Sequence, residues 1–128
     1  MDPILIPARE RSPRVDFRFD EHRLSLAGES YPEDAAAFYV PVVKALVEYC
    51  RTVPEEEIVF TVALTYFNTS SAKVLMNIFH LLEHHGQAGA RIHLIWNHHK
   101  DDEMMMEFGA DFSRDLQHVK FTLHELDT

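Results

Sequence analysis

Apolar and polar residues alternate clearly at two places near the start of the chain. Val15, Phe17 and Phe19 stand at every second position between charged residues, and Leu24 and Leu26 repeat this spacing after a short polar turn. A period of two is typical of a strand that buries one face. The two runs therefore predict an antiparallel hairpin, which we place at the edge of a sheet.

The segments on either side of this hairpin show different patterns. Residues 1–14 carry three prolines and mixed charge without periodicity, so we expect an N-terminal arm. After the hairpin, Ser30 and Glu33 fit a capping box, with Ser30 as the N-cap of a helix. Four apolar residues then share one face of that helix: Phe38, Val42, Leu46 and Tyr49. Because proline removes a backbone donor, Pro41 predicts a kink or a restarted helix, which ends near Thr52.

The most hydrophobic run of the chain leads directly into its clearest amphipathic pattern. Residues 58–67 are apolar at nearly every position, which predicts a central strand covered on both faces. The following pattern predicts a helix with Gly86 at its C-terminal cap. Its buried stripe consists of Val74, Leu75, Ile78, Phe79 and Leu82.

Three further segments complete the pattern. They are a β-rich run at residues 91–96, a helix that starts at the acids 101–103 and buries Met105, Phe108 and Phe112, and a strand with alternating Val119, Phe121 and Leu123. The predicted order is β-β-α-β-α-β-α-β, which indicates an α/β fold with a central mixed sheet and helices packed on it. No repeat or linker divides residues 1–128, so we expect a single domain.

Composition and charge mainly exclude classes of function. A hydrophobic content of 46% with 26% charged residues is typical of a soluble globular domain with a real core. The net charge of −9 argues against binding to nucleic acids and to acidic membranes. Neither a membrane-spanning run nor a signal peptide is evident, and the single cysteine, Cys50, suits a reducing compartment. We therefore expect a cytoplasmic protein with protein or small-molecule partners.

The candidate chemistry lies where the hydrophobic strand meets the amphipathic helix. Asn68, Thr69, Ser70 and Ser71 place small polar side chains beside the free N–H groups of a helix N-terminus. One interpretation is a helix cap only, a role that needs one such residue and contributes about 1 kcal/mol. The other is a phosphoacceptor hydroxyl, whose added charge of roughly −2 the helix N-terminus would stabilise.

The outward face of the same helix offers a surface for a partner. Lys73, Met76, Asn77, His80 and His84 lie opposite the buried stripe, and this face begins beside the polar cluster. A solvated face is one interpretation. The other is a recognition face on which Met76 acts as an adaptable apolar contact.

Catalytic and metal-binding motifs are missing from the chain. His80 and His84 stand four residues apart, a spacing that suits two ligands, yet the nine histidines form no HExxH motif and no CxxC pair accompanies them. There is also no GxSxG elbow, P-loop or GxGxxG motif. We therefore expect no enzyme, no metal site and no cofactor. A small histidine-rich metal-binding protein or enzyme, and a constitutive protein-interaction module, remain the alternatives.

Three segments in matching order resemble the SiaC family of bacterial regulatory phosphoproteins. They are residues 28–33, residues 66–71, and Trp96 with the acids 101–103 and residues 109–112. Together they span nearly the whole chain. The resemblance implies a fold similar to anti-sigma-factor antagonists of the STAS type, and a signalling role by partner switching.

The resemblance also implies which residue is modified and by what. A dedicated serine/threonine kinase of the histidine-kinase-like ATPase type would phosphorylate Thr69, and a PP2C-like phosphatase would reverse this. Asn68, Ser70 and Ser71 would shape the site for both enzymes. The unmodified form would bind and regulate an output protein, in the studied system a diguanylate cyclase, which links the family to cyclic-di-GMP. After the tryptophan, relatives tend to carry aromatic residues, whereas this chain has Asn-His-His at residues 97–99. We expect a loop there, and if this loop contacts a partner, its residues bear on the identity of that partner.

Overall fold

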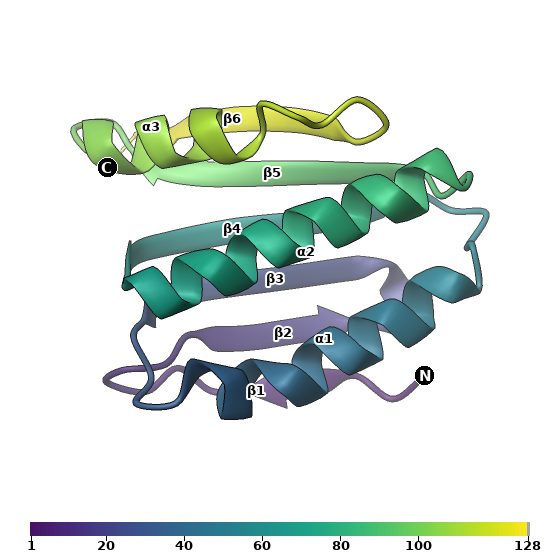
Figure 1. The fold of residues 1–128 in the computed structure, drawn as a ribbon, viewed down its shortest axis with the longest axis horizontal. Coiled ribbons are helices and arrows are strands. Elements are labelled where there is room, and N and C mark those ends of the chain that lie inside the picture. Colours follow the sequence, from purple (N-terminus) through teal and green to yellow (C-terminus); the bar gives the residue numbers. More distant parts are fainter. Residues whose placement is uncertain (128) are drawn as a thin grey trace.

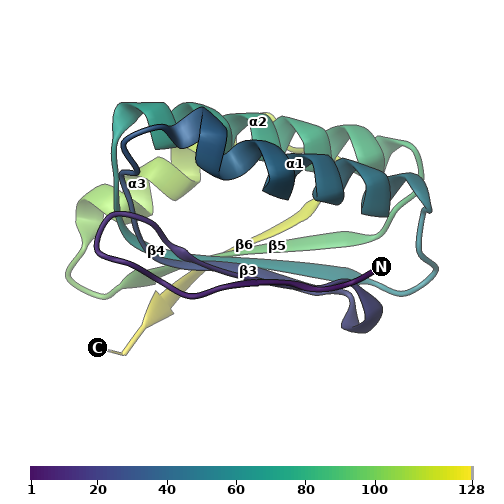
Figure 2. The same cartoon turned by 90° about the horizontal axis from the view of Figure 1, so that it is seen from below.

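Residues 1–127, which the computed structural model describes, form a six-stranded sheet with three helices on one side of it (Figure 1, Figure 2). Along the chain the elements are β1 (Ile4–Ile6), β2 (Arg14–Arg18), the 3-10 helix η1 (Phe19–Glu21), β3 (Arg23–Ser30), α1 (Ala35–Arg51), β4 (Ile58–Phe67), α2 (Thr69–Gln87), β5 (Ile92–His99), α3 (Glu103–Phe112) and β6 (Lys120–Leu126).

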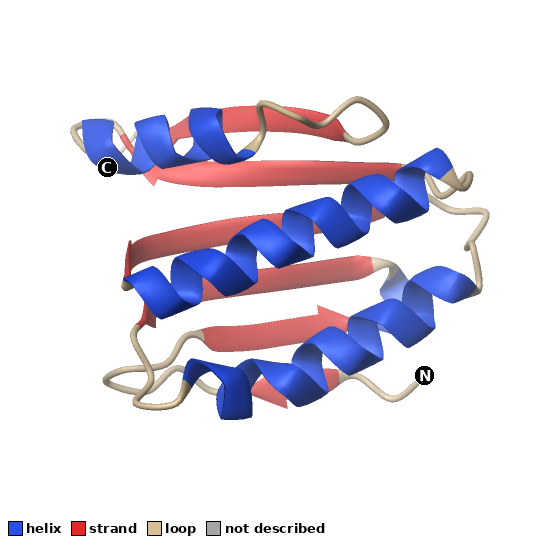
Figure 3. Ribbon diagram, in the orientation of Figure 1, coloured by secondary structure: helices blue, strands red, loops and turns tan. Residues whose placement is uncertain are grey.

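The strands lie in the sheet in the order in which they occur along the chain. β1, β2 and β3 pair antiparallel, and β3 to β6 pair parallel, so each parallel pair is joined by one helix (Figure 3). The predicted α/β fold with a mixed sheet is confirmed. The similarity to anti-sigma-factor antagonists of the STAS type stays a prediction.

The helices cover only one face of the sheet (Figure 2). On β4, Ile58, Phe60 and Val62 face the helices and are at most 1% exposed, whereas the residues between them are half-buried on the open face. The prediction that residues 58–67 are covered on both faces was therefore wrong. Val59 on the open face lies between β3 and β5, and Ala63 lies beside Ala27 of β3, so both are half-buried without a helix over them.

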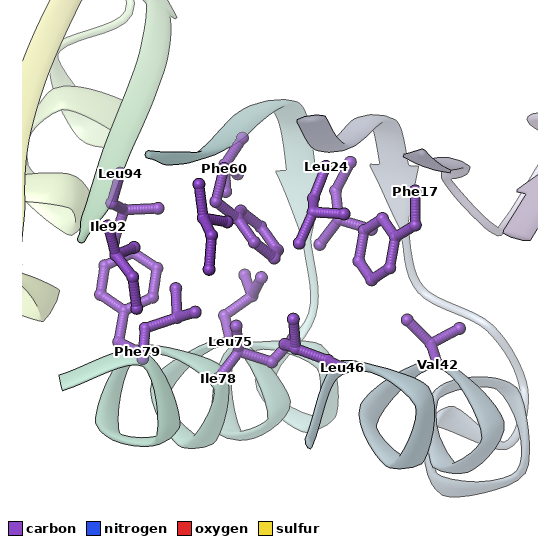
Figure 4. Close-up of a cluster of buried hydrophobic side chains, with 14 of the residues drawn as sticks. Phe17, Leu24, Val42, Leu46, Phe60, Leu75, Ile78, Phe79, Ile92 and Leu94 are labelled. Atoms are coloured by element: carbon purple, nitrogen blue, oxygen red, sulfur yellow. The ribbon is translucent and has the colours of Figure 1, made fainter. Parts of the chain in front are cut away.

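The core lies between the sheet and the helices (Figure 4). Phe17 and Leu24 of the predicted hairpin, Phe60 of β4 and Leu94 of β5 point toward the helices, and each is at most 1% exposed. The helices contribute Val42, Leu46, Leu75, Ile78 and Phe79. Among residues 1–127, no helix combines the length and the hydropathy needed to cross a bilayer.

The N-terminal segment contributes a strand that the sequence pattern did not reveal. Within residues 1–14, predicted as an arm, Ile4–Ile6 form β1 and pair with β2 at the edge of the sheet. Three residues are too few to show an alternation, and the prolines on either side dominate the pattern.

The first helix begins four residues later than predicted. Asp34 is its N-cap, and the carboxylate accepts a hydrogen bond from the backbone N–H of Ala37 at 3.0 Å. Ser30 is instead the last residue of β3 and is fully buried, so the capping box assigned to it was wrong. Pro41 lies within a single helix that does not restart, and Thr52 is the C-cap as expected.

The end of α2 and the end of β5 also differ from the prediction. Gly86 lies inside α2, where a Cβ would stand 2.6 Å from the carbonyl oxygen of His118, and Gly89 with φ +116° follows the C-cap instead. Asn97, His98 and His99 extend β5 rather than forming a loop. His98 faces the helices and is 5% exposed, because the strand alternation that buries Trp96 continues through it.

Candidate functional site

The candidate site lies at the edge of the sheet where β4 and β5 end and where α2 and α3 begin (Figure 1). The pairing of β3 with β4 shifts here by one residue: Gly28 pairs with Leu64, but Glu29 pairs with Tyr66. Thr65 is therefore an extra residue on β4. A bulge of this kind turns the following side chains to new directions, and Gly28, with φ +107°, supplies the unusual backbone conformation opposite it.

The bulge decides which aromatic residue next to the site is buried. Phe67 turns toward the helices, where its ring centroid lies 4.9 Å from that of Phe108 and 6.2 Å from that of Trp96. Tyr66 turns outward, is 51% exposed and packs edge-on against Tyr31 at 5.5 Å. The chain therefore enters α2 from a residue anchored in the core, with the exposed Tyr66 and the half-buried Tyr31 beside it.

Asn68 is the N-cap of α2 and is held at three points. Its side-chain oxygen accepts a hydrogen bond from the backbone N–H of Ser71 at 2.9 Å. Its own N–H donates to the carbonyl oxygen of Ser30 at 3.1 Å, and its carbonyl accepts from Ala72 at 2.9 Å. The cap predicted for this cluster is therefore present, and Asn68 alone provides it.

The other three residues of the cluster have different surroundings. Thr69 and Ser70 are exposed, whereas Ser71 is fully buried. The Ser71 hydroxyl accepts a hydrogen bond from the Ser30 hydroxyl at 2.8 Å, and the latter lies 2.6 Å from the hydroxyl of Tyr39. A modifying enzyme thus finds the hydroxyls of Thr69 and Ser70 at the surface, but not that of Ser71.

Ser30 and Tyr39 belong to the site although sequence reasoning missed them. Ser30 lies in one of the three segments that carry the family resemblance, but it was assigned to a helix cap. Tyr39 follows Phe38, which was placed on the buried face of the helix; the structure buries Tyr39 and leaves Phe38 half-buried. Burial raises the pKa of Tyr39, and its hydrogen bond with Ser30 opposes that rise.

The electrostatics of the N-terminus of α2 favour an added anion. The first turn of α2 contains no acidic residue, and its cap, Asn68, is neutral. By contrast, α3 has an acidic cap and Glu103 in its first turn. The partial positive charge at the start of α2 is therefore not offset by a carboxylate on its cap or in its first turn.

The predicted partner face is exposed as expected. Lys73, Met76, Asn77, His80 and His84 all lie on the solvent side of α2, and Met76 is 42% exposed. Within the described part of the chain, no three His, Cys, Asp or Glu side chains come together in a way that could hold a metal ion.

Comparisons with known proteins agree over nearly the whole chain. The family model described as "SiaC family regulatory phosphoprotein" matches residues 6–126. An uncharacterized protein of Pseudomonas aeruginosa (strain UCBPP-PA14) is 30% identical over 115 residues, which are 90% of each chain.

Solved structures show the same similarity. The structure of SiaC of Pseudomonas aeruginosa matches with a TM-score of 0.89 and 26% identity, over 98% of this chain and 100% of that chain. A second structure, of the diguanylate cyclase SiaD in complex with its activator SiaC from the same organism, matches with a TM-score of 0.90 and 27% identity. That match covers 96% of this chain and 99% of the other.

Proposed function

Because this chain belongs to the SiaC family of regulatory phosphoproteins, we propose that it is a non-enzymatic, cytoplasmic partner-switching protein controlled by reversible phosphorylation of Thr69. The observation that carries the proposal is the position of Thr69, whose side chain is exposed on the first residue of α2. The kinase transfers the γ-phosphoryl group of ATP to this hydroxyl, which loses its proton, and ADP leaves. Asn68, Ser70 and Ser71 shape the helix N-terminus that the kinase and the phosphatase recognise.

The added phosphate changes the charge at one end of the partner face. It brings roughly two negative charges to an N-terminus that carries no acid in its first turn. Four residues further along α2, Lys73 lies about 40° from Thr69 around the helix axis. The phosphate thus stands at the end of the partner face, which includes the exposed side chain of Met76. An apolar partner contact placed there is disfavoured by the charge, so the unmodified form is the one that binds.

The proposed output protein is a diguanylate cyclase. This rests on the match to SiaC of Pseudomonas aeruginosa, which is described as the activator of the diguanylate cyclase SiaD and stands in complex with it. The proposed enzymes that act on Thr69 are a histidine-kinase-like ATPase and a PP2C-like phosphatase. The partner face of α2, with Lys73, Met76, Asn77 and His80, is the proposed contact.

The acceptor is tested with the cognate kinase, ATP and intact-mass measurement. Wild-type protein is expected to gain one phosphoryl group, and Thr69→Ala is expected to gain none. Ser70→Ala is the matched control, because it removes the neighbouring exposed hydroxyl and leaves Thr69 in place. Phosphate that persists at Ser70 in Thr69→Ala would show that the acceptor is assigned wrongly.

The switch is tested by partner binding of Thr69→Ala and Thr69→Glu. The alanine variant is expected to bind the output protein like the unmodified wild type, and the glutamate variant more weakly, although glutamate carries only part of the charge of a phosphate. Equal binding by both variants would favour the alternative of a constitutive interaction module. The mass of the protein isolated from its native host separates these two functions independently.

A further inference from the structure

Three hydroxyl groups from three different elements form a buried chain beneath the proposed phosphoacceptor. Tyr39 lies on α1, Ser30 ends β3 and Ser71 lies in the first turn of α2. The Tyr39 and Ser30 oxygens are 2.6 Å apart, and the Ser30 and Ser71 oxygens are 2.8 Å apart. All three side chains are at most 1% exposed.

The direction of this chain follows from the number of protons available. A hydroxyl group has one proton to donate, and Ser30 donates its proton to Ser71. The bond between Tyr39 and Ser30 therefore requires Tyr39 as the donor, so the hydroxyl protons are donated from Tyr39 to Ser30 and from Ser30 to Ser71. Removing the Tyr39 hydroxyl leaves the oxygen of Ser30 without its donor in a fully buried place.

Ser30 also holds the main chain at the start of α2. Its carbonyl oxygen accepts the N–H of Asn68, and its hydroxyl binds Ser71, so Ser30 contacts residues on both sides of Thr69. Residues two positions apart differ by about 200° around a helix axis. Fixing Ser71 toward the core therefore turns Thr69 toward solvent.

We propose that Tyr39 and Ser30 are positioning residues for phosphorylation of Thr69, which they direct outward by holding Ser71 in the core. The inference rests on the proposed function and names what selects the hydroxyl. Hydrogen bonds are suited to this role because they fix an orientation, whereas an apolar contact would tolerate rotation of the first turn. Disruption of this row of hydrogen bonds lets the first turn of α2 sample other orientations, so the kinase meets fewer molecules in which Thr69 is presented for phosphorylation.

The experiment compares Tyr39→Phe with Tyr49→Phe. Both substitutions remove one hydroxyl from a buried tyrosine of α1, but Tyr49 bonds to His22 and not to Ser30. With the cognate kinase, the KM for Tyr39→Phe is expected to rise about threefold to tenfold, which is the range that one hydrogen bond supports, while kcat stays within about twofold. Tyr49→Phe is expected to keep the wild-type KM. A wild-type KM in Tyr39→Phe, or an equal rise in both variants, would overturn the proposal.

Amide hydrogen exchange tests the same network without any kinase. In Tyr39→Phe and in Ser30→Ala, the amides of Ser71 and Ala72 are expected to exchange about threefold to tenfold faster than in wild type, and in Tyr49→Phe to remain unchanged. Unchanged exchange in both network variants would contradict the proposal. If the wild-type protein is not phosphorylated at Thr69, the proposed function fails, and the exchange result still decides whether the network holds α2.

Discussion

Asn68→Ala tests the cap that holds the start of α2. The substitution removes the bond of 2.9 Å from the N–H of Ser71, but it leaves the main-chain bond from the residue 68 N–H to Ser30 in place. One N-cap is lost, so we expect the free energy of unfolding to fall by about 1 kcal/mol, within a range of roughly 0.5–2 kcal/mol. For a chain of this size, that corresponds to a decrease in Tm of about 3–5 °C.

The assay is urea unfolding followed by circular dichroism, with two companion variants. Asn68→Asp keeps an acceptor and adds a negative charge at the N-terminus of α2, so its stability is expected to equal or exceed that of wild type. Asn77→Ala changes an exposed asparagine on the same helix and is expected to leave stability unchanged or slightly raised. If Asn68→Ala and Asn77→Ala both stay within about 0.3 kcal/mol of wild type, Asn68 does not cap the helix.

Two other substitutions test how the surrounding helices are held. In Gly109→Ala the new Cβ would lie 2.6 Å from the ring of the fully buried Trp96, so we expect the free energy of unfolding, measured with urea, to fall by about 1–3 kcal/mol despite the better helix propensity of alanine. Ala110→Ser, at the adjacent exposed position, is the control. Wild-type stability in Gly109→Ala would contradict this packing. Burial of Glu83 opposes ionisation, but hydrogen bonds from the His118 side chain and from two backbone N–H groups lower the pKa of Glu83 below its ordinary 4.5. A carboxyl group whose pKa is lowered in the folded state stabilises the fold above pH 4.5, and this stabilisation is lost as the pH falls through the folded pKa. Glu83→Gln is therefore expected to be less stable than wild type at pH 7, and the difference in stability is expected to disappear below pH 4.5. A difference that stays constant with pH would refute the lowered pKa of Glu83.

Local patterns predicted those elements that are long enough to show a period. The hairpin at Val15 and Leu24, the helix at Leu75 and the β-rich run at residues 91–96 each show their pattern over several residues, and all are present, although Phe19 at the end of the first run lies in η1. β1 has three residues and shows no period. The one-sided cover of β4 was missed because a sequence reports that Val59 is apolar, but not whether a helix or only neighbouring strands lie over it.

The candidate site was predicted as a segment but not as a structure. The four polar residues 68–71 could be found by eye, and the cap was expected among them. What separates them is the burial of Ser71, which depends on Ser30 and Tyr39, 41 and 32 positions earlier in the chain. These contacts come from the pairing of β3 with β4 and from the packing of α1 on the sheet, and the bulge at Thr65 that orients this junction lies opposite Gly28 in that pairing.

The central claim is that phosphate on Thr69 controls binding to an output protein. Its most direct test is one titration of the proposed diguanylate cyclase partner with two samples of wild-type protein, unmodified and phosphorylated to completion by the proposed kinase. The unmodified sample is expected to bind at least about tenfold more tightly, a difference of about 1.4 kcal/mol, and phosphatase treatment is expected to restore the affinity. Equal affinities of the two samples would contradict the account.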